Sequence, residues 1–121
     1  MILEEDFEKI LDEVILENDK VVVLYSGIWT FIYNINFRLK NKSLIPHKIL
    51  DIIEKKIGKN KTLFLPSFSG DFFSKNRTFN ITKGIDKDNG ILSIIGLERK
   101  YFRTSQPIHS YIAFGNLKDV K

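Results

Sequence analysis

Residues 101–115 read YFRTSQPIHSYIAFG, a stretch in which a polar segment runs directly into an apolar one. His109 and Ser110 stand next to each other immediately before the apolar residues 111–114. Loops at the ends of strands are where α/β proteins commonly place their functional groups. The stretch therefore predicts a buried strand with a candidate functional loop before it. Taken alone, it leaves open whether the loop is a site or only a turn.

The amino-terminal part of the chain alternates between helical and strand patterns. Apolar residues at helical spacing predict a helix over residues 3–17. Residues 20–25, KVVVLY, form a continuous β-branched and aliphatic run, which is typical of a parallel strand buried on both faces. We expect a loop from residue 28 that enters a second helix and ends near Lys42.

The middle of the chain carries the clearest signals. Residues 45–57 have an isoleucine and leucine stripe at helical spacing, with Pro46 near the first turn and Gly58 as the stop. Ser43 is a candidate cap for this helix. Residues 62–66, TLFLP, predict a second short buried strand, which gives a β-α-α-β unit with room for a right-handed crossover.

The remaining residues predict a long loop followed by shorter elements. Residues 67–83 show no helical period and exceed the usual loop length. A turn at residues 86–90 leads into a short helix over residues 91–97, and short strands are expected at residues 100–102 and 112–114. The alternation of strands and helices indicates an α/β fold.

The composition is that of one globular domain without cysteine chemistry. The chain has 121 residues, 43% hydrophobic and 28% charged, with no cysteine. The absence of cysteine excludes disulfides, thiolate nucleophiles and cysteine-based zinc sites. Two well-separated histidines do not favour a histidine-rich metal site either. We therefore expect a single domain over residues 1–121 and no metal.

The charge and hydropathy patterns restrict the partners. The net charge is +4 and the pI is about 9.3, which is compatible with an anionic ligand such as a nucleotide or a phosphate. The lysines are spread along the chain, so nucleic-acid binding is not expected. No apolar run approaches the ~20 residues of a membrane span. The acidic, amphipathic start MILEEDFEKILDE is not a signal peptide, and a cytoplasmic location is the expectation.

Three places in the chain offer chemistry. His109 beside a hydroxyl could act as a general base, although its ring could equally pack or hydrogen-bond locally. The small residues Ser26 and Gly27 follow a predicted strand, an arrangement that can bind anions but is also a common simple connection. Asp71 could orient a cationic amine, although such an aspartate more often caps a turn. Ser110 is a weaker candidate nucleophile because it has no G-x-S-x-G context.

Four short motifs occur in order along the chain. They are VVLYSGIW at residues 22–29, TLFLPSFS at residues 62–69, DNGIL at residues 88–92, and R-T-x-x-P-x-x-S-x-x-A-x-G at residues 103–115. In order and spacing they resemble the aminoglycoside 3-N-acetyltransferase family, which includes relatives that act on amino sugars of surface polysaccharides. The resemblance covers residues 18–116. The last motif is moderately specific, and the other motifs are individually weak.

The resemblance implies a layered α/β/α sandwich with a largely parallel central sheet. It also implies transfer of an acetyl group from acetyl-CoA, as co-substrate, to the amine of a small acceptor, in antibiotic resistance or polysaccharide biosynthesis. A protonated amine is not nucleophilic, so a base is needed near the thioester. The resemblance implies that the last motif supplies a catalytic histidine, and the histidine in this motif here is His109. Asp71 would bind the acceptor. The residues that would line the CoA site are Ser26, Gly27, Ile28, Trp29, Thr104 and Ser110.

The chain departs from the family pattern in ways that bear on activity. Gln106 precedes Pro107 where family members typically have a histidine, so either His109 replaces the base or activity is lost. Ile94 stands where the family often has a glutamate. Family enzymes also continue far beyond this motif, so the chain resembles an incomplete, amino-terminal part of such an enzyme. A second chain or a homo-oligomer would then cover its open sheet edge and apolar surface.

Two other functions remain open at this point. The chain could be a catalytically inactive half-domain or interaction module that keeps the family fold. It could also be a small phosphate-binding α/β domain unrelated to acetylation, if the motif match is chance.

Overall fold

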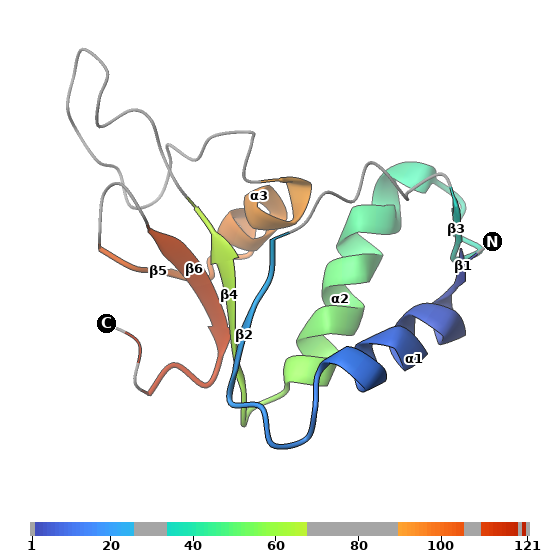
Figure 1. The fold of residues 1–121 in the computed structure, drawn as a ribbon. Coiled ribbons are helices and arrows are strands. Elements are labelled where there is room, and N and C mark those ends of the chain that lie inside the picture. The colour runs from blue at the N-terminus through green and yellow to red at the C-terminus, as the bar shows by residue number, and fades with distance from the viewer. Residues whose placement is uncertain (1, 26–33, 68–89, 106–109, 119, 121) are drawn as a thin grey trace, which may run out of the picture.

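The structure, a computed structural model, describes residues 2–25, 34–67, 90–105, 110–118 and 120. In these residues helices and strands alternate along the chain (Figure 1). The helices are α1 (Glu4–Val14), α2 (Ile45–Ile57) and α3 (Ile91–Glu98), with a 3-10 turn, η3 (Lys42–Leu44), before α2. The strands are β1 (Ile2–Leu3), β2 (Val21–Val23), β3 (Ile35–Asn36), β4 (Thr62–Pro66), β5 (Phe102–Arg103) and β6 (Tyr111–Gly115).

The larger sheet has four strands in the order β2-β4-β6-β5. β2 is parallel to β4, whereas β6 is antiparallel to both β4 and β5. A separate pair, β1 and β3, is parallel. The α/β class is confirmed. In the described residues the pairings are mixed and not largely parallel, because β6 follows β5 by a short return and so runs antiparallel to it.

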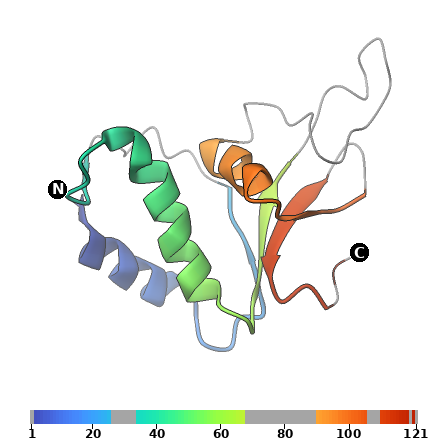
Figure 2. The same ribbon diagram turned by 180° about the vertical axis from the view of Figure 1, so that it is seen from behind.

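The three helices lie on one side of the larger sheet (Figures 1 and 2). We call the side that faces them the inner face and the opposite side the outer face. The described helices thus form one layer on the sheet, and the second helical layer expected for an α/β/α sandwich is not formed by the described residues. The core between α2, α3 and the inner face is aliphatic, with Leu50, Leu63 and Ile112 fully buried.

The predicted helix over residues 45–57 is confirmed as α2, with Pro46 in its first turn. Gly58 ends it with a φ of +60°, a left-handed value that glycine adopts at little cost. Ser43 does not cap α2. Instead the Asn41 side chain accepts a hydrogen bond of 2.9 Å from the Ser43 amide and so begins the 3-10 turn.

α3 confirms the short helix predicted over residues 91–97 and extends it by one residue. Its residues are apolar apart from Ser93 and Glu98, which suits a helix that lies between α2 and the inner face. Gly96 allows the close contact, since a Cβ there would lie 2.7 Å from Ile112 Cδ1 and 2.9 Å from Tyr101 Cδ2.

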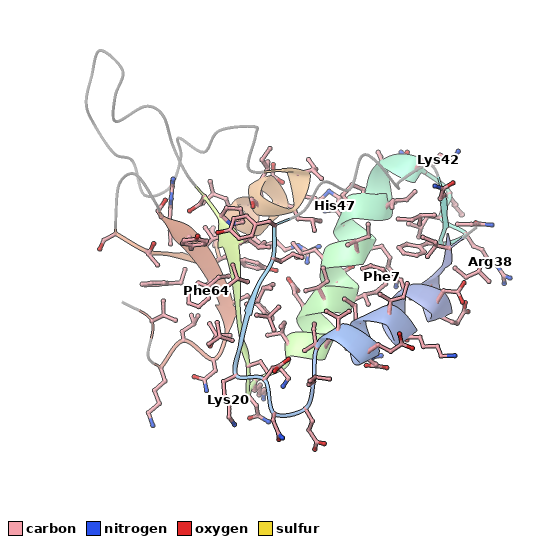
Figure 3. The ribbon with its side chains drawn as sticks, in the orientation of Figure 1. Phe7, Lys20, Arg38, Lys42, His47 and Phe64 are labelled. Carbon is pink, nitrogen blue, oxygen red and sulfur yellow. The ribbon has the colours of Figure 1, made fainter. Side chains whose placement is uncertain are left out.

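The helix expected to end near Lys42 is wrong for the part of it that the structure describes. Ile35 and Phe37 are buried whereas Asn36 is exposed, an alternation that belongs to a strand. β3 pairs with β1, and the ring of Phe37 lies 6.1 Å from that of Phe7 in α1. Figure 3 shows Phe7 pointing between α1 and α2.

The prediction that the strand at residues 20–25 is buried on both faces is also wrong. β2 lies at the edge of the sheet, and Val21 and Val23 are 55% and 49% exposed. Only its inner-facing side chains, Val22 and Leu24, are partly buried. The helix predicted over residues 3–17 is shorter, because the chain is already extended at Ile15 and the Asp19 carboxylate accepts the amide of Leu16 at 2.9 Å.

Candidate functional site at the carboxyl edge of the sheet

Strands β2, β4 and β5 end, and β6 begins, at the same edge of the larger sheet (Figure 1). We call it the carboxyl edge. The Ser67 amide donates to the Ser110 carbonyl at 3.0 Å, and the Thr104 amide donates to the Tyr111 carbonyl at 2.8 Å. Tyr25, Ser67 and Ser110 lie at this edge. They are adjacent in sequence to the segments that hold most of the predicted site residues.

Ser67, Arg103 and Ser110 form a buried polar cluster on the inner face of this edge. They are 0%, 3% and 0% exposed. Arg103 Nη2 donates to the Ser67 carbonyl at 2.7 Å, and Arg103 Nε donates to Ser110 Oγ at 3.3 Å. Burial lowers the pKa of Arg103. Because the arginine comes from β5 and the serines from β4 and β6, the cluster joins the ends of three strands.

The hydroxyl group of Ser110 makes all its hydrogen bonds within this cluster. It donates to the Ser67 carbonyl at 2.8 Å, and it lies 3.0 Å from Ser67 Oγ. With Ser67 Oγ and Arg103 Nε as donors to it, its hydrogen and both lone pairs are engaged. This arrangement favours a supporting role for Ser110 over direct contact with a ligand.

Thr104 directly follows β5 and is hydrogen-bonded to Tyr111, the first residue of β6. Its Oγ1 accepts the Tyr111 amide at 2.9 Å, while its own amide donates to the Tyr111 carbonyl. The side chain thus takes the place of a backbone acceptor where the β5–β6 pairing ends. Two of the predicted site residues, Thr104 and Ser110, lie within the described residues. Their contacts hold together the end of β5 and the start of β6.

Tyr25 and Tyr111 join β2 to β6 on the outer face of the same edge. Their hydroxyl oxygens are 2.5 Å apart and their rings meet edge to face, with centroids 6.5 Å apart at 80°. The hydrogen bond from Tyr25, together with burial, raises the pKa of Tyr111. Ser26 directly follows Tyr25, and His109 lies two residues before Tyr111. The described residues that flank two of the predicted site segments are thus joined by a side-chain hydrogen bond across β4.

The other predicted site residues lie outside the described residues. They are Ser26, Gly27, Ile28, Trp29, Asp71 and His109. Sequence reasoning did not identify Ser67, Arg103, Tyr25 or Tyr111 as parts of the site. Strand alternation could have indicated the two buried positions, because Ser67 extends the face of Leu63 and Leu65, and Arg103 pairs with Ile112 across β5 and β6.

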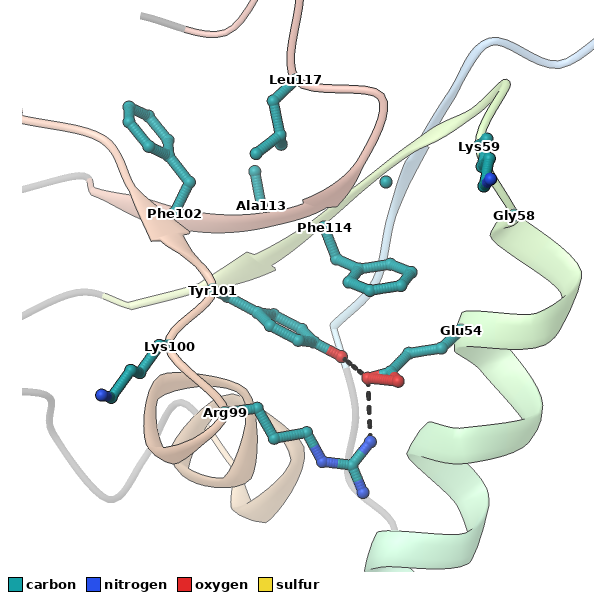
Figure 4. A pocket seen from close by; sticks show the side chains of 11 residues that line it. Glu54, Gly58, Lys59, Arg99, Lys100, Tyr101, Phe102, Ala113, Phe114 and Leu117 are labelled. Carbon is teal, nitrogen blue, oxygen red and sulfur yellow. Dashed lines mark hydrogen bonds and ion pairs between the residues drawn. The ribbon is translucent and has the colours of Figure 1, made fainter.

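A second polar network lies between α2, α3 and the start of β5 (Figure 4). Glu54 Oε2 accepts from Arg99 Nη1 at 2.8 Å and from the Tyr101 hydroxyl. Arg99 Nη2 also pairs with Asp51 at 2.9 Å. Burial lowers the pKa of Arg99, but the two carboxylates outweigh it and the pKa is raised. The network borders a hollow of 510 Å³ that reaches Gly115, at the end of β6 opposite the carboxyl edge.

Neither a metal site nor a membrane span is found in the part of the chain described. No three His, Asp or Glu side chains there come together as metal ligands. None of the helices described is long and apolar enough to cross a bilayer.

The fold and the carboxyl edge define an α/β protein whose polar groups gather where strands end. No protein-family model matches the chain, and no curated protein matches it. Among solved structures, it is similar to the crystal structure of aminoglycoside acetyltransferase AAC(3)-IIb, with a TM-score of 0.67 and 15% identity. The match covers 97% of this chain and 46% of that one, so the chain spans less than half of that protein's length. At this identity the similarity shows a shared fold.

Proposed function

We propose that the chain is an acetyl-CoA-dependent N-acetyltransferase domain that acts in the cytoplasm on an amino group of an aminoglycoside or amino sugar. The observation that carries the proposal is the fold similarity to an aminoglycoside acetyltransferase over 97% of this chain. It agrees with the resemblance of the four sequence motifs to the same family. Fold alone does not define function, so the chemistry rests on the residues at the carboxyl edge.

The proposed reaction is direct transfer. His109 takes a proton from the acceptor ammonium, and the freed amine attacks the thioester carbonyl. The carbon–sulfur bond then breaks, and CoA leaves as a thiol after taking up a proton. No enzyme nucleophile is needed, which suits a chain without cysteine. Asp71 would hold the acceptor amine by its charge.

Contacts between the described strand ends at this edge support the proposal of a CoA site here. Ser26, Gly27, Ile28 and Trp29 would hold the pantetheine, partly through backbone groups. The Tyr25–Tyr111 hydrogen bond of 2.5 Å links the residue before that segment to the start of β6, across β4. The buried polar cluster fixes the same end of β6 from the inner face. Binding and base segments would therefore share one rigid support.

Calorimetry with acetyl-CoA tests binding first. We expect saturable heat at ligand concentrations up to about 1 mM, and its absence would count against the proposal. In a transfer assay, His109→Ala should abolish acetylation while binding is kept. His47→Ala is the matched control, because His47 is the other histidine and lies exposed on α2. Unchanged turnover in His109→Ala would remove His109 from the mechanism.

A second candidate function is a catalytically inactive half-domain or interaction module with the same fold. Gln106, at the position where the resembling family has histidine, favours it. So does the exposure of several large apolar residues on the sheet, which a second chain or a second copy could cover. Failure to bind acetyl-CoA by a folded chain would favour this function over the first.

A further inference from the structure

The outer face of the larger sheet carries no charged side chain in the described residues. The strand register and the alternation of side chains define which residues share this face. From one end of the sheet to the other they form three rows, which are Val21, Thr62 and Gly115; Val23, Phe64, Ala113 and Phe102; and Tyr25, Pro66, Tyr111 and Thr104.

Much of this face is open to solvent. Val21, Val23, Tyr25 and Phe102 are 42% to 62% exposed. When one face of an antiparallel or mixed sheet is exposed to solvent, that face normally carries polar residues. Here the inner face is covered by helices and is apolar apart from Ser67, Arg103 and Ser110. The outer face is uncharged and uncovered by any described helix, although Pro66 and Ala113 on it are buried. A sheet with mainly apolar side chains on both faces is built to be covered on both.

The width of the face suits a pair of helices. With strands ~4.8 Å apart, the four strands are together roughly 19 Å wide. A helix is about 10 Å wide, so two helices side by side span the four strands.

Helices can also gain area that a flat sheet would not reach. Leu117, 38% exposed, is drawn on the same side of β6 as Ala113 and Phe102 (Figure 4). Leu117 and Phe102 both line the 510 Å³ hollow next to β5 and β6. A helical partner that continues past β5 would fill this hollow in addition to covering the face.

The charges at the margin indicate the chemistry of the partner. Lys20 lies just before β2 and Lys118 just after β6, so both are at the end of the sheet opposite the carboxyl edge (Figure 3 labels Lys20). Both are exposed, and neither forms an ion pair within the part of the chain described. Complementary charge on a partner would therefore be acidic at this margin.

We infer that the outer face binds a two-helix segment of a second polypeptide, apolar toward the sheet and acidic toward Lys20 and Lys118. The inference names the partner for the second-chain part of the proposed function. It does not depend on acetyl-CoA binding, which calorimetry tests separately on the same preparation.

The test is an NMR titration of the isotope-labelled chain with a designed helical hairpin. The hairpin carries a leucine stripe on one face and glutamates on its flanks, and a matched hairpin carries lysines in place of the glutamates. We expect shifts confined to outer-face residues and about tenfold weaker binding of the lysine hairpin. Val23→Lys should weaken binding of the glutamate hairpin by tenfold or more. Val14→Lys, at a residue 68% exposed on α1, should leave it unchanged.

Three results would overturn the inference. They are no binding by a folded chain, shifts outside the outer face, or equal binding by Val23→Lys. Phe102→Lys is a second variant for the case in which Val23→Lys does not fold, which circular dichroism would show. Analytical ultracentrifugation of the chain alone tests whether a second copy covers the outer face. A stable dimer that Val23→Lys dissociates would assign the face to a second copy instead.

Discussion

Glu54 is the side chain through which two helices and a strand are joined. Its Oε2 accepts from both Arg99, at the end of α3, and Tyr101, at the start of β5. Burial, and after it the hydrogen bond and charge of Glu54, raises the pKa of the Tyr101 hydroxyl well above its ordinary value of 10.0. The phenol therefore stays protonated in the folded chain at a pH where the unfolded chain loses that proton.

This difference predicts how stability changes with pH. Below pH 10 both states keep the Tyr101 proton, and its contribution is fully present. Above pH 10 only the folded state keeps it, so stability falls as pH rises, by up to about 1.4 kcal/mol per pH unit. Urea unfolding at several values between about pH 8 and pH 11 should show a steeper decline for the natural chain than for Tyr101→Phe. Equal slopes would contradict the role assigned to Tyr101.

At the level of elements, α1 is attached to the rest of the fold with little burial. None of its residues is buried, although Phe7 and Leu11 pack partly against the core, as does Ile15 directly after the helix. Lys61, just before β4, supplies a specific attachment. Its Nζ donates to the carbonyls that follow α1, namely Leu16 at 2.9 Å, Glu17 at 2.8 Å and Asp19 at 2.6 Å.

Replacing Lys61 should therefore loosen α1 more than replacing another lysine that contacts it. We expect Lys61→Met to lower the free energy of unfolding by about 1.5–3 kcal/mol, because charge-assisted bonds to carbonyls are lost. Lys56→Met is the control. Lys56 pairs with Asp12 of α1 at 2.7 Å, but Asp12 is 63% exposed, and such surface pairs contribute below about 1 kcal/mol. Similar losses in urea unfolding would refute the special role of Lys61.

Elements with a strong local pattern could be predicted from the sequence. α2 and β4 have the predicted bounds because their apolar spacing, Pro46 and Gly58 act within the segment itself. β3 could not be recognised, since its partner β1 lies far away in the sequence. The exposure of Val23 was mispredicted for a related reason, because a strand pattern does not show which helices cover it.

The candidate site was predictable only in part for the same physical reason. The motif around Thr104 and Ser110 indicated the loop. The buried polar cluster needs Ser67, Arg103 and Ser110 from three strands, and only the sheet register brings them together. Its contacts were therefore invisible in any single stretch of sequence.

For the molecule as a whole, the order of the sheet predicts which parts open most easily. β4 lies between β2 and β6, and its Leu63 and Leu65 are 0% and 1% exposed. β2 lies at the edge with its outer face bare, and β1 and β3 form only a two-residue pair. Amides that are buried and paired on both sides exchange with solvent only when the whole domain unfolds.

Native-state hydrogen exchange should therefore divide the chain into distinct classes. We expect the hydrogen-bonded amides of β4 and β6 to exchange with the free energy and denaturant dependence of global unfolding. Those of β1 and β3 should exchange by local opening, with little dependence on denaturant. β2 should lie between them, because one side of this strand is paired with β4 and its outer face is uncovered. If β2 amides were as protected as those of β4, the outer face would have to be covered in the isolated chain, and the site inferred for a helical partner would already be filled.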